Sequence, residues 1–206
     1  MSQLSERILA IDMSTKTGWA LMVSDGKDCT LLEYGKIEKT SEPEGMYPAN
    51  FVEWAEDIHE SIRDLIRDHA PDVLVIEETA SGSKSIYSQK ILEWIHFLLA
   101  NHIKKSNIKA VYLLTEQWRR ETGCLMSKEE SKHNKEVKKY KEKAGTSIAY
   151  NADGKRIGKI TRKHVNIRRA NEVFEKFLKE PLRKKDEDTA DSLLLGYCYH
   201  LRKGRI

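Results

Sequence analysis

Three short runs of β-forming residues occupy the first 38 positions, and their close spacing constrains the fold more than any other feature of this 206-residue sequence. The runs read RILAID, GWALMVS and CTLLEYGKI, and the turns between them carry Gly18 and the pair Asp25-Gly26. Connections this short join antiparallel neighbours, because a parallel connection needs a crossover of about a dozen residues or more. The sequence therefore predicts an antiparallel three-stranded meander.

Two pairs of helix and strand follow the meander. Apolar residues at steps of three and four predict a helix over residues 51–66, which Pro71 ends. The run DVLVIEE, residues 72–78, is apolar through its centre, as is typical of a strand buried on both faces. A second amphipathic helix over 87–99 and the strand KAVYLLT, residues 109–115, complete the order β-β-β-α-β-α-β. This order predicts an α/β fold with a five-stranded mixed sheet flanked by helices.

The pattern loosens in the second half of the chain. Residues 127–145 are nearly devoid of apolar side chains, and we interpret them either as an exposed helix or as a mobile insertion. Short β-prone pieces around Asp153-Gly154 predict a small hairpin within 148–160. We expect a single domain, residues 1–206, with a basic insertion at about 121–160.

Two further helices are expected after the insertion. The first covers residues 163–179, and the second covers residues 189–201 and closes the fold. The inward-facing side chains of the first are expected to be Ile167, Ala170, Phe174, Phe177 and Leu178.

Positive charge is concentrated in one segment. Residues 127–169 contain 14 Lys and Arg against 5 Asp and Glu, so this segment carries +9 and the rest of the chain −5, for a net charge of +4. Such a distribution indicates a polyanionic partner. A solvated surface of mixed charge accounts for it equally well.

The three cysteines lie far apart in the sequence, at Cys29, Cys124 and Cys198, with no CxxC pair. This spacing argues against a zinc site and against a disulfide framework, and it indicates a reducing compartment. The start MSQLSER lacks the features of a signal peptide, and no apolar run is as long as a membrane span. We therefore expect a cytoplasmic protein without a membrane partner.

Four carboxylates stand where a metal site could form. Asp12 ends the first strand, Glu77 ends the fourth, and Asp188 and Asp191 lie three residues apart at the start of the last helix. If these elements meet, the like charges repel one another unless a cation lies between them. Oxygen ligands without His or Cys suit Mg²⁺ or Mn²⁺, and two such ions support phosphodiester hydrolysis. The set therefore indicates a nuclease.

Each carboxylate also has a purely structural explanation. Asp12 can form a turn with the small polar residues after it, and Asp188 and Asp191 can complement the helix dipole. Glu77 at the end of a buried strand requires a partner, which a lysine could supply. The functional interpretation depends on the four residues together.

Three motifs resemble those of the RuvC-type Holliday junction resolvases, a branch of the RNase H-like nuclease superfamily. They are ILAIDMSTKTGWAL, PDVLVIEETASGSKS and DEDTADSLLLG, in this order along the chain. The resemblance implies an RNase H-like fold and two Mg²⁺ ions, for which Mn²⁺ is expected to substitute. It implies that Asp12 is shared by both ions, with Glu77 on one side and Asp188 and Asp191 on the other.

The resemblance also implies a homodimer that cuts a four-way DNA junction by paired symmetric nicks, in recombination, repair or replication. It places the protein in a bacterium or a phage, and no nucleotide cofactor is expected. Resemblance further suggests a catalytic role for Lys163 near the scissile phosphate, although an ordinary surface lysine is nearly as good an interpretation. The expected DNA-binding residues are Lys84, Lys163, Arg168 and Arg169.

Some neighbouring acidic residues compete for these roles. Glu78 points to the opposite strand face from Glu77, so we choose Glu77. Asp186 and Glu187 compete with Asp188, which we prefer because the motif continues from it into the helix.

Other functions remain open on the same scaffold. They are cleavage of another branched DNA or of an RNA–DNA hybrid, non-catalytic binding of branched nucleic acid, and the ATPase chemistry of the actin-like superfamily. The last requires a second phosphate-binding turn, which we do not find in this sequence. The basic insertion is either a DNA-gripping arm or a surface decoration, and we favour DNA contact.

Overall fold

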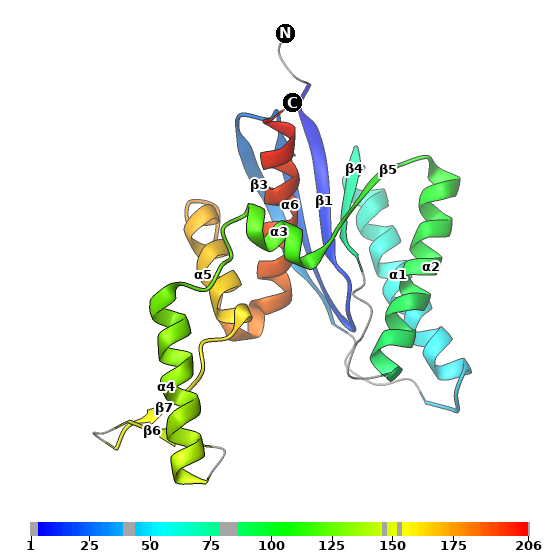
Figure 1. Cartoon of the computed structure of the whole chain (residues 1–206). Helices are drawn as coiled ribbons and strands as arrows, with labels where there is room; N and C mark the ends of the chain where they lie inside the picture. Colours follow the sequence, from blue (N-terminus) through cyan, green and yellow to red (C-terminus); the bar gives the residue numbers. More distant parts are fainter. Residues whose placement is uncertain (1–3, 39–43, 79–85, 146–147, 152–153, 206) are drawn as a thin grey trace.

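A five-stranded mixed sheet forms the centre of the protein in a computed structural model, which describes residues 4–38, 44–78, 86–145, 148–151 and 154–205 (Figure 1). The strand order is β3-β2-β1-β4-β5. Antiparallel pairing joins β1 (Glu6–Asp12), β2 (Lys16–Ser24) and β3 (Cys29–Glu38). The strands β4 (Val73–Glu77) and β5 (Lys109–Leu113) run parallel to β1. The predicted meander and mixed sheet are confirmed.

Helices cover both faces of the sheet. On one face lie α1 (Ala49–His69) and α2 (Ile86–Ser106), and on the other lie α5 (Arg162–Phe174) and α6 (Glu187–Lys203) (Figure 1). Along β1, Leu9 and Ile11 point into the first core, and Ala10 points into the second. Burial on both faces explains why this strand is apolar throughout.

A helix and a hairpin extend away from the sheet. The helix α4 (Lys128–Ala144) begins at a capping box in which Ser127 and Glu130 each bond the other's backbone N–H. It is followed by the short strands β6 (Ala149–Tyr150) and β7 (Arg156–Ile157), which pair antiparallel. The predicted hairpin is therefore confirmed, although Asp153 of its turn lies outside the described residues. We call residues 127–160 the arm (Figure 1).

One predicted helix ends early. The helix expected over 163–179 stops at Phe174, and Phe177, expected to point inward, is 40% exposed. The cause is the Asn171 side chain, which accepts a hydrogen bond from the Leu182 N–H at 2.7 Å and donates one to the Leu182 carbonyl at 3.0 Å. These bonds hold the returning chain against the helix, so the residues after Phe174 turn instead of continuing it.

Two other features of the described chain bear on the expectations from sequence. Cys29, Cys124 and Cys198 are free cysteines, and the last two are buried. None of the helices described here has the length and apolar character needed to span a membrane.

Candidate functional site

The four predicted carboxylates come together at one edge of the sheet. Asp12 and Glu77 end the neighbouring parallel strands β1 and β4, so both lie at the carboxyl edge. Asp188 and Asp191 lie in the first turns of α6, which packs across β1 and β2. Burial raises the pKa of Asp12 well above its usual range, and the negative charges of Asp191, Glu77 and Asp188 raise it further. We call these residues the carboxylate cluster.

Asp12 is not used to close the turn that follows it. Thr17 donates its hydroxyl to the Ser14 carbonyl at 2.7 Å, and the Ser14 hydroxyl accepts from the Lys16 N–H at 3.0 Å. Within the described part of the chain, no hydrogen bond reaches the Asp12 carboxylate. Ser14 and Thr17 thus close the turn by these hydrogen bonds, without one from the Asp12 carboxylate.

Glu77 is held by two donors from a short helix, α3 (Thr115–Glu121). The Thr115 hydroxyl donates to Oε1 of Glu77, and the indole N–H of Trp118 donates to Oε2 at 3.1 Å. Neutral donors, rather than the lysine that was considered, thus compensate for placing this carboxylate at the edge of the core. The adjacent Glu78 is exposed, as its position on the opposite strand face predicts.

Asp191 has two polar partners. Asn166 of α5 donates to its Oδ1 at 2.7 Å, and Arg119 of α3 lies 3.5 Å from its Oδ2. Burial raises the pKa of Asp191 to about 6, although Arg119 and the Asn166 hydrogen bond oppose the shift. A fixed cation and an amide donor therefore hold this carboxylate in place.

The three acidic residues at positions 186–188 have different contacts, which distinguish their roles. The Asp186 carboxylate accepts from the Arg183 N–H at 2.9 Å and so caps the 3-10 turn η1 (Lys184–Asp186). Glu187 forms an ion pair with Lys163, which is the first-turn lysine of α5. Burial, together with the charge of Glu187, raises the pKa of Asp188. Of these three residues, Asp188 is the one whose charge raises the pKa of both Asp12 and Asp191.

The donor set fits a hard divalent cation, because it consists of carboxylate oxygens without His or Cys. In the described residues, however, no three His, Cys, Asp or Glu side chains already form a metal cage. Arg119 and Asn166 bind the Asp191 oxygens, and Trp118 and Thr115 bind those of Glu77. The arrangement is a set of oriented carboxylates beside Asp12, whose carboxylate has no hydrogen bond or ion pair among the described residues.

The remaining predicted DNA-binding residues differ in their surroundings. Arg168 forms an ion pair with Glu130 at 2.5 Å, and Arg169 donates to the Thr122 carbonyl at 2.8 Å. Lys163 stays half exposed beside the carboxylate cluster. Lys84 lies outside the described residues. Arg168 and Arg169 thus make contacts within the protein, and their binding to DNA stays a prediction.

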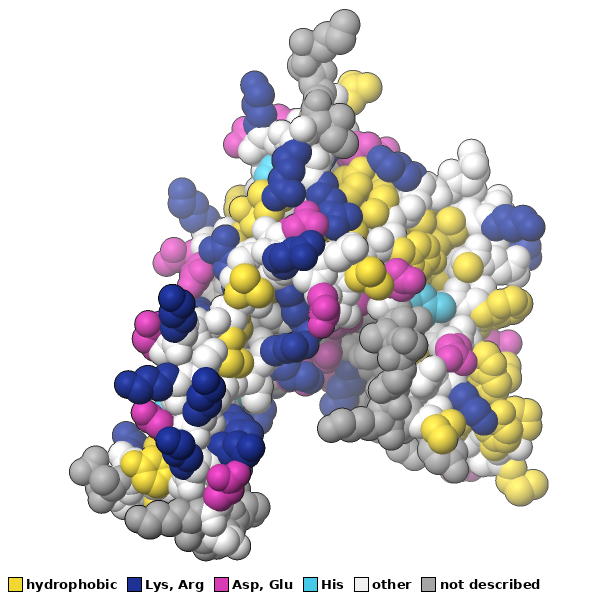
Figure 2. All heavy atoms as spheres, in the orientation of Figure 1, with side chains coloured by type: hydrophobic (Ala, Val, Ile, Leu, Met, Phe, Trp, Pro, Cys, Tyr) yellow, Lys and Arg dark blue, Asp and Glu magenta, His cyan; other side chains and the backbone are white. Residues whose placement is uncertain are grey.

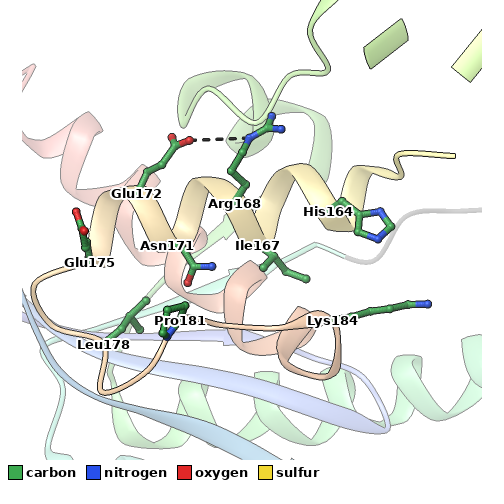
Figure 3. Close-up of a pocket in the computed structure, with 9 residues that line it drawn as sticks. All are labelled: His164, Ile167, Arg168, Asn171, Glu172, Glu175, Leu178, Pro181 and Lys184. Carbon is green, nitrogen blue, oxygen red and sulfur yellow. Dashed lines mark ion pairs between the residues drawn. The ribbon is translucent and has the colours of Figure 1, made fainter. Parts of the chain in front are cut away.

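A pocket of about 560 Å³ lies apart from the carboxylate cluster (Figure 3). Its wall consists of α5 and the returning segment 175–184, with Ile167, Leu178 and Pro181 as apolar lining. None of the four carboxylates lines this pocket, so we assign it no part in the site.

Reasoning from sequence missed α3 and the residues it brings to the site. Thr115, Trp118 and Arg119 reach Glu77 and Asp191 from a helix of only seven residues, too short for a periodic pattern. Asn166, fully buried in α5, was also missed. The one available signal was a Trp inside the polar run TEQWRRETG directly after a strand.

The sheet order and the acidic residues at the ends of β1 and β4 correspond to the RNase H-like class of folds. Comparison with solved structures narrows the fold to that of RuvC. Thermus thermophilus RuvC in complex with a Holliday junction substrate has a TM-score of 0.61 at 11% identity, over 96% of this chain and 94% of that chain. Another Thermus thermophilus RuvC structure gives a TM-score of 0.59 at 13% identity, with the same coverage of 96% and 94%.

The yeast mitochondrial Holliday junction resolvase Ydc2 is a third similar structure. Its TM-score is 0.54 at 14% identity, over 97% of this chain and 80% of that chain. Identities this low establish a common fold, which confirms the predicted fold class. No protein-family model matches the sequence, and no curated protein does.

Proposed function

We propose that this protein is a metal-dependent endonuclease that resolves four-way DNA junctions. The observation that carries the proposal is the convergence of Asp12, Glu77, Asp188 and Asp191 at one edge of a RuvC-like sheet. The similar Thermus protein is bound to a Holliday junction substrate. Net positive charge on this chain is consistent with a nucleic-acid substrate.

Two Mg²⁺ ions are the proposed cofactor. Asp12 would bind both, Glu77 would bind one, and Asp188 with Asp191 would bind the other. The carboxylates repel one another at neutral pH, so a divalent cation relieves a cost that the folded chain already bears. When bound, the ions would activate a water and stabilise the leaving oxygen of the cleaved phosphodiester.

Other residues of the chain orient the carboxylates of the site, and a lysine would offset the charge of the phosphate. Trp118 and Thr115 fix both oxygens of Glu77, which limits the rotation of this carboxylate. Arg119 and Asn166 do the same for Asp191. Lys163, half exposed beside the carboxylate cluster, would contact the phosphate and offset its negative charge.

Pairing of two subunits follows from the proposed substrate. A four-way junction has two equivalent strands to cut, and a homodimer with two-fold symmetry presents two equivalent sites to them. One subunit carries one carboxylate cluster, so symmetric cleavage requires a second copy of this chain.

The test is a cleavage assay on a panel of DNA substrates with Mg²⁺, with Mn²⁺ and with EDTA. Four-way junctions, flaps, an RNA–DNA hybrid and linear duplex are compared, and ATP hydrolysis is measured in parallel. We expect metal-dependent cleavage with preference for the four-way junction. Preference for the flap would indicate a nuclease for another branched DNA, and preference for the hybrid would indicate an RNA–DNA hybrid nuclease. Binding without cleavage would indicate a non-catalytic nucleic-acid-binding protein.

Site variants separate the proposed cluster from its surroundings. Asp12→Asn and Glu77→Gln should each abolish cleavage, because each removes a charged metal ligand while keeping the side-chain shape. Glu78→Gln is the matched control, since Glu78 is exposed on the opposite face of the same strand end. Full cleavage by Asp12→Asn would reject the metal assignment.

A further inference from the structure

A stripe of lysines runs along one face of α4 in the arm. Residues spaced by four, three and four positions share a helix face. The stripe consists of Lys128, Lys132, Lys135 and Lys139. All four are exposed, and among the ion pairs between described residues none involves them. Unpaired like charges in a row cost free energy unless a polyanion compensates for them.

The opposite face of α4 is packed against the rest of the arm. Val137 is fully buried there, and Ala149 of the hairpin is buried as well. The lysine stripe lies on the other side of the helix from Val137, as the helical spacing requires. The hairpin thus supports α4 from one side and leaves the lysine stripe open to a partner.

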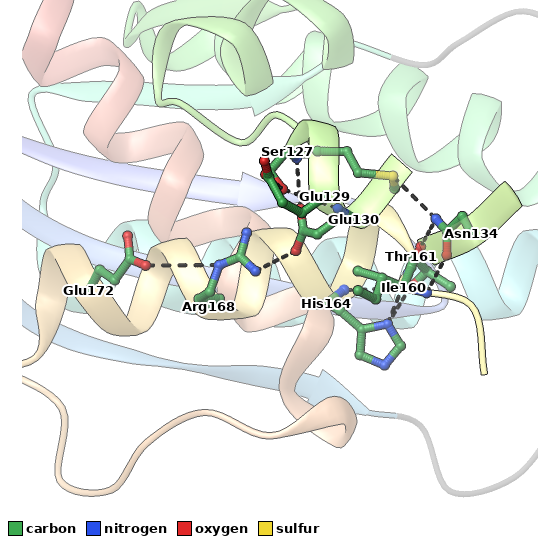
Figure 4. A network of polar contacts seen from close by, with 10 residues as sticks. Ser127, Glu129, Glu130, Asn134, Ile160, Thr161, His164, Arg168 and Glu172 are labelled. Carbon is green, nitrogen blue, oxygen red and sulfur yellow. Dashed lines mark hydrogen bonds and ion pairs between the residues drawn. The ribbon is translucent and has the colours of Figure 1, made fainter. Parts of the chain in front are cut away.

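Polar contacts hold the arm together and fasten it to α5 (Figure 4). Within the arm, Asn134 bonds both the N–H and the carbonyl of Ile160 at 2.8 Å, and the His133 ring bonds the Gly158 carbonyl at 2.9 Å. Between the arm and α5, Glu130 pairs with Arg168 at 2.5 Å. Because α5 carries Lys163 beside the carboxylate cluster, the arm is held in a defined position relative to the site.

Basic side chains also line the concave side of the molecule. In Figure 2, dark blue Lys and Arg side chains cover α4 and line the hollow between the arm and the layer of α1 and α2. The distance from Lys128 to Lys139 along the helix is about 16 Å, which spans roughly five phosphates of one DNA strand.

We infer that the arm binds duplex DNA, with the lysine stripe contacting the phosphates of a duplex that leads away from the cleavage site. Tyr140, the aromatic residue of α4, is turned by about 100° from Lys139 around the helix, so a base has no ring to stack on along the stripe, which disfavours a single strand. Lysine ammonium groups act as point charges on phosphate oxygens, and phosphate contacts carry no sequence information, so the proposed contact is independent of sequence. The choice of DNA as the polyanion rests on the proposed function.

The test measures binding of the full chain to a four-way junction, a linear DNA duplex and an RNA duplex in EDTA, over a range of salt concentrations. The stripe variant carries Lys128→Gln, Lys132→Gln, Lys135→Gln and Lys139→Gln, and Gln keeps the helix propensity. The control variant removes the same charge from exposed lysines elsewhere, through Lys104→Gln, Lys105→Gln, Lys176→Gln and Lys179→Gln.

Each lysine that contacts a phosphate contributes about 0.9 to the slope of log K against log salt. We expect the four substitutions of the stripe variant to reduce this slope by about 3.6 and to lower DNA affinity at least tenfold near 50 mM salt, with the control variant close to wild type. Equal slopes for the two variants would overturn the inference. An equal loss on the RNA duplex would overturn the assignment to DNA.

Binding and cleavage assays together distinguish an arm that does not bind DNA from a protein that is not a nuclease. If wild type binds DNA through the stripe but cuts no substrate, the arm is assigned correctly and the nuclease proposal fails. If wild type cuts junctions while both variants bind alike, the nuclease proposal stands and the arm is not a DNA-binding element.

Discussion

The backbone of Asp188, in the first turn of α6, lies directly against Gly18 of β2, in the space that a Cβ atom would fill. A Cβ built on Gly18 would overlap the Asp188 carbonyl and lie 2.8 Å from the Thr189 nitrogen. Gly18 is also the cross-strand partner of Asp12. The absence of a side chain at this position therefore brings α6, with two of the four carboxylates, up to the end of β1.

Gly18→Ala should displace the start of α6. We expect it to lower the free energy of unfolding by about 2–3 kcal/mol, because the added methyl meets backbone that cannot rotate away. Urea denaturation measures the loss, and Gly158→Ala is the control, since nothing lies within 4 Å of a Cβ there. Equal stability of the two variants would contradict this account of the α6 position.

Trp118→Phe tests the orientation of Glu77. The variant keeps an aromatic ring in the core but removes the N–H that donates to Oε2 at 3.1 Å. We expect about a tenfold loss of junction cleavage and a loss of about 1 kcal/mol in stability. Trp54→Phe is the matched control, because the buried indole nitrogen of Trp54 has no hydrogen-bond partner in the described chain. Similar activities of the two variants would remove Trp118 from the site.

Asp12→Asn should make the metal-free protein more stable. Burial raises the pKa of Asp12, so the folded state binds this proton more tightly than the unfolded chain does. The wild type therefore loses stability as pH rises from the unfolded pKa, about 4, through the raised folded value. Melting in EDTA should show an advantage for the variant that grows from pH 5 to pH 7.

Mg²⁺ should reverse the order of stability of the wild type and Asp12→Asn. It is expected to raise the melting temperature of the wild type and to leave Asp12→Asn unchanged, because the cation binds the folded state through this carboxylate. An equal Mg²⁺ shift in both proteins would place the ion elsewhere.

The apparent affinity for Mg²⁺ should increase with pH. Burial raises the pKa of Asp191 to about 6, and a carboxylate must lose its proton to bind a metal. The Mg²⁺ concentration for half-maximal cleavage should fall as pH rises from 5 to 7, at constant ionic strength. A half-maximal concentration that does not change over this range would exclude Asp191 as a ligand.

The central features of the fold could be predicted because they are local patterns. Alternate side chains of β1 enter two cores, which makes the strand apolar throughout and leaves Asp12 at its end. Alternate side chains of β4 likewise enter the two cores, which leaves Glu77 at the end of an apolar strand. Two parallel neighbours end at the same edge of a sheet, so the meeting of these two residues followed from the order of the elements.

What the sequence could not predict depends on contacts between distant residues. The helix α3 is too short to be stable alone, and its side chains bind residues 38 to 84 positions away along the chain. Arg168 looked free to bind DNA because its partner, Glu130, lies 38 positions earlier. The early end of α5 likewise depends on Asn171 binding a loop 11 residues later.

Mapping of the cleavage positions on a four-way junction shows whether this protein resolves such junctions. Each strand of the junction is end-labelled in turn and treated with the protein and Mg²⁺, and DNA ligase is added to the products. We expect nicks at matching positions in two opposed strands, which ligase seals to give intact duplexes. Cleavage confined to one strand, equal cleavage of linear duplex, or undiminished nicking by Asp12→Asn would contradict this expectation.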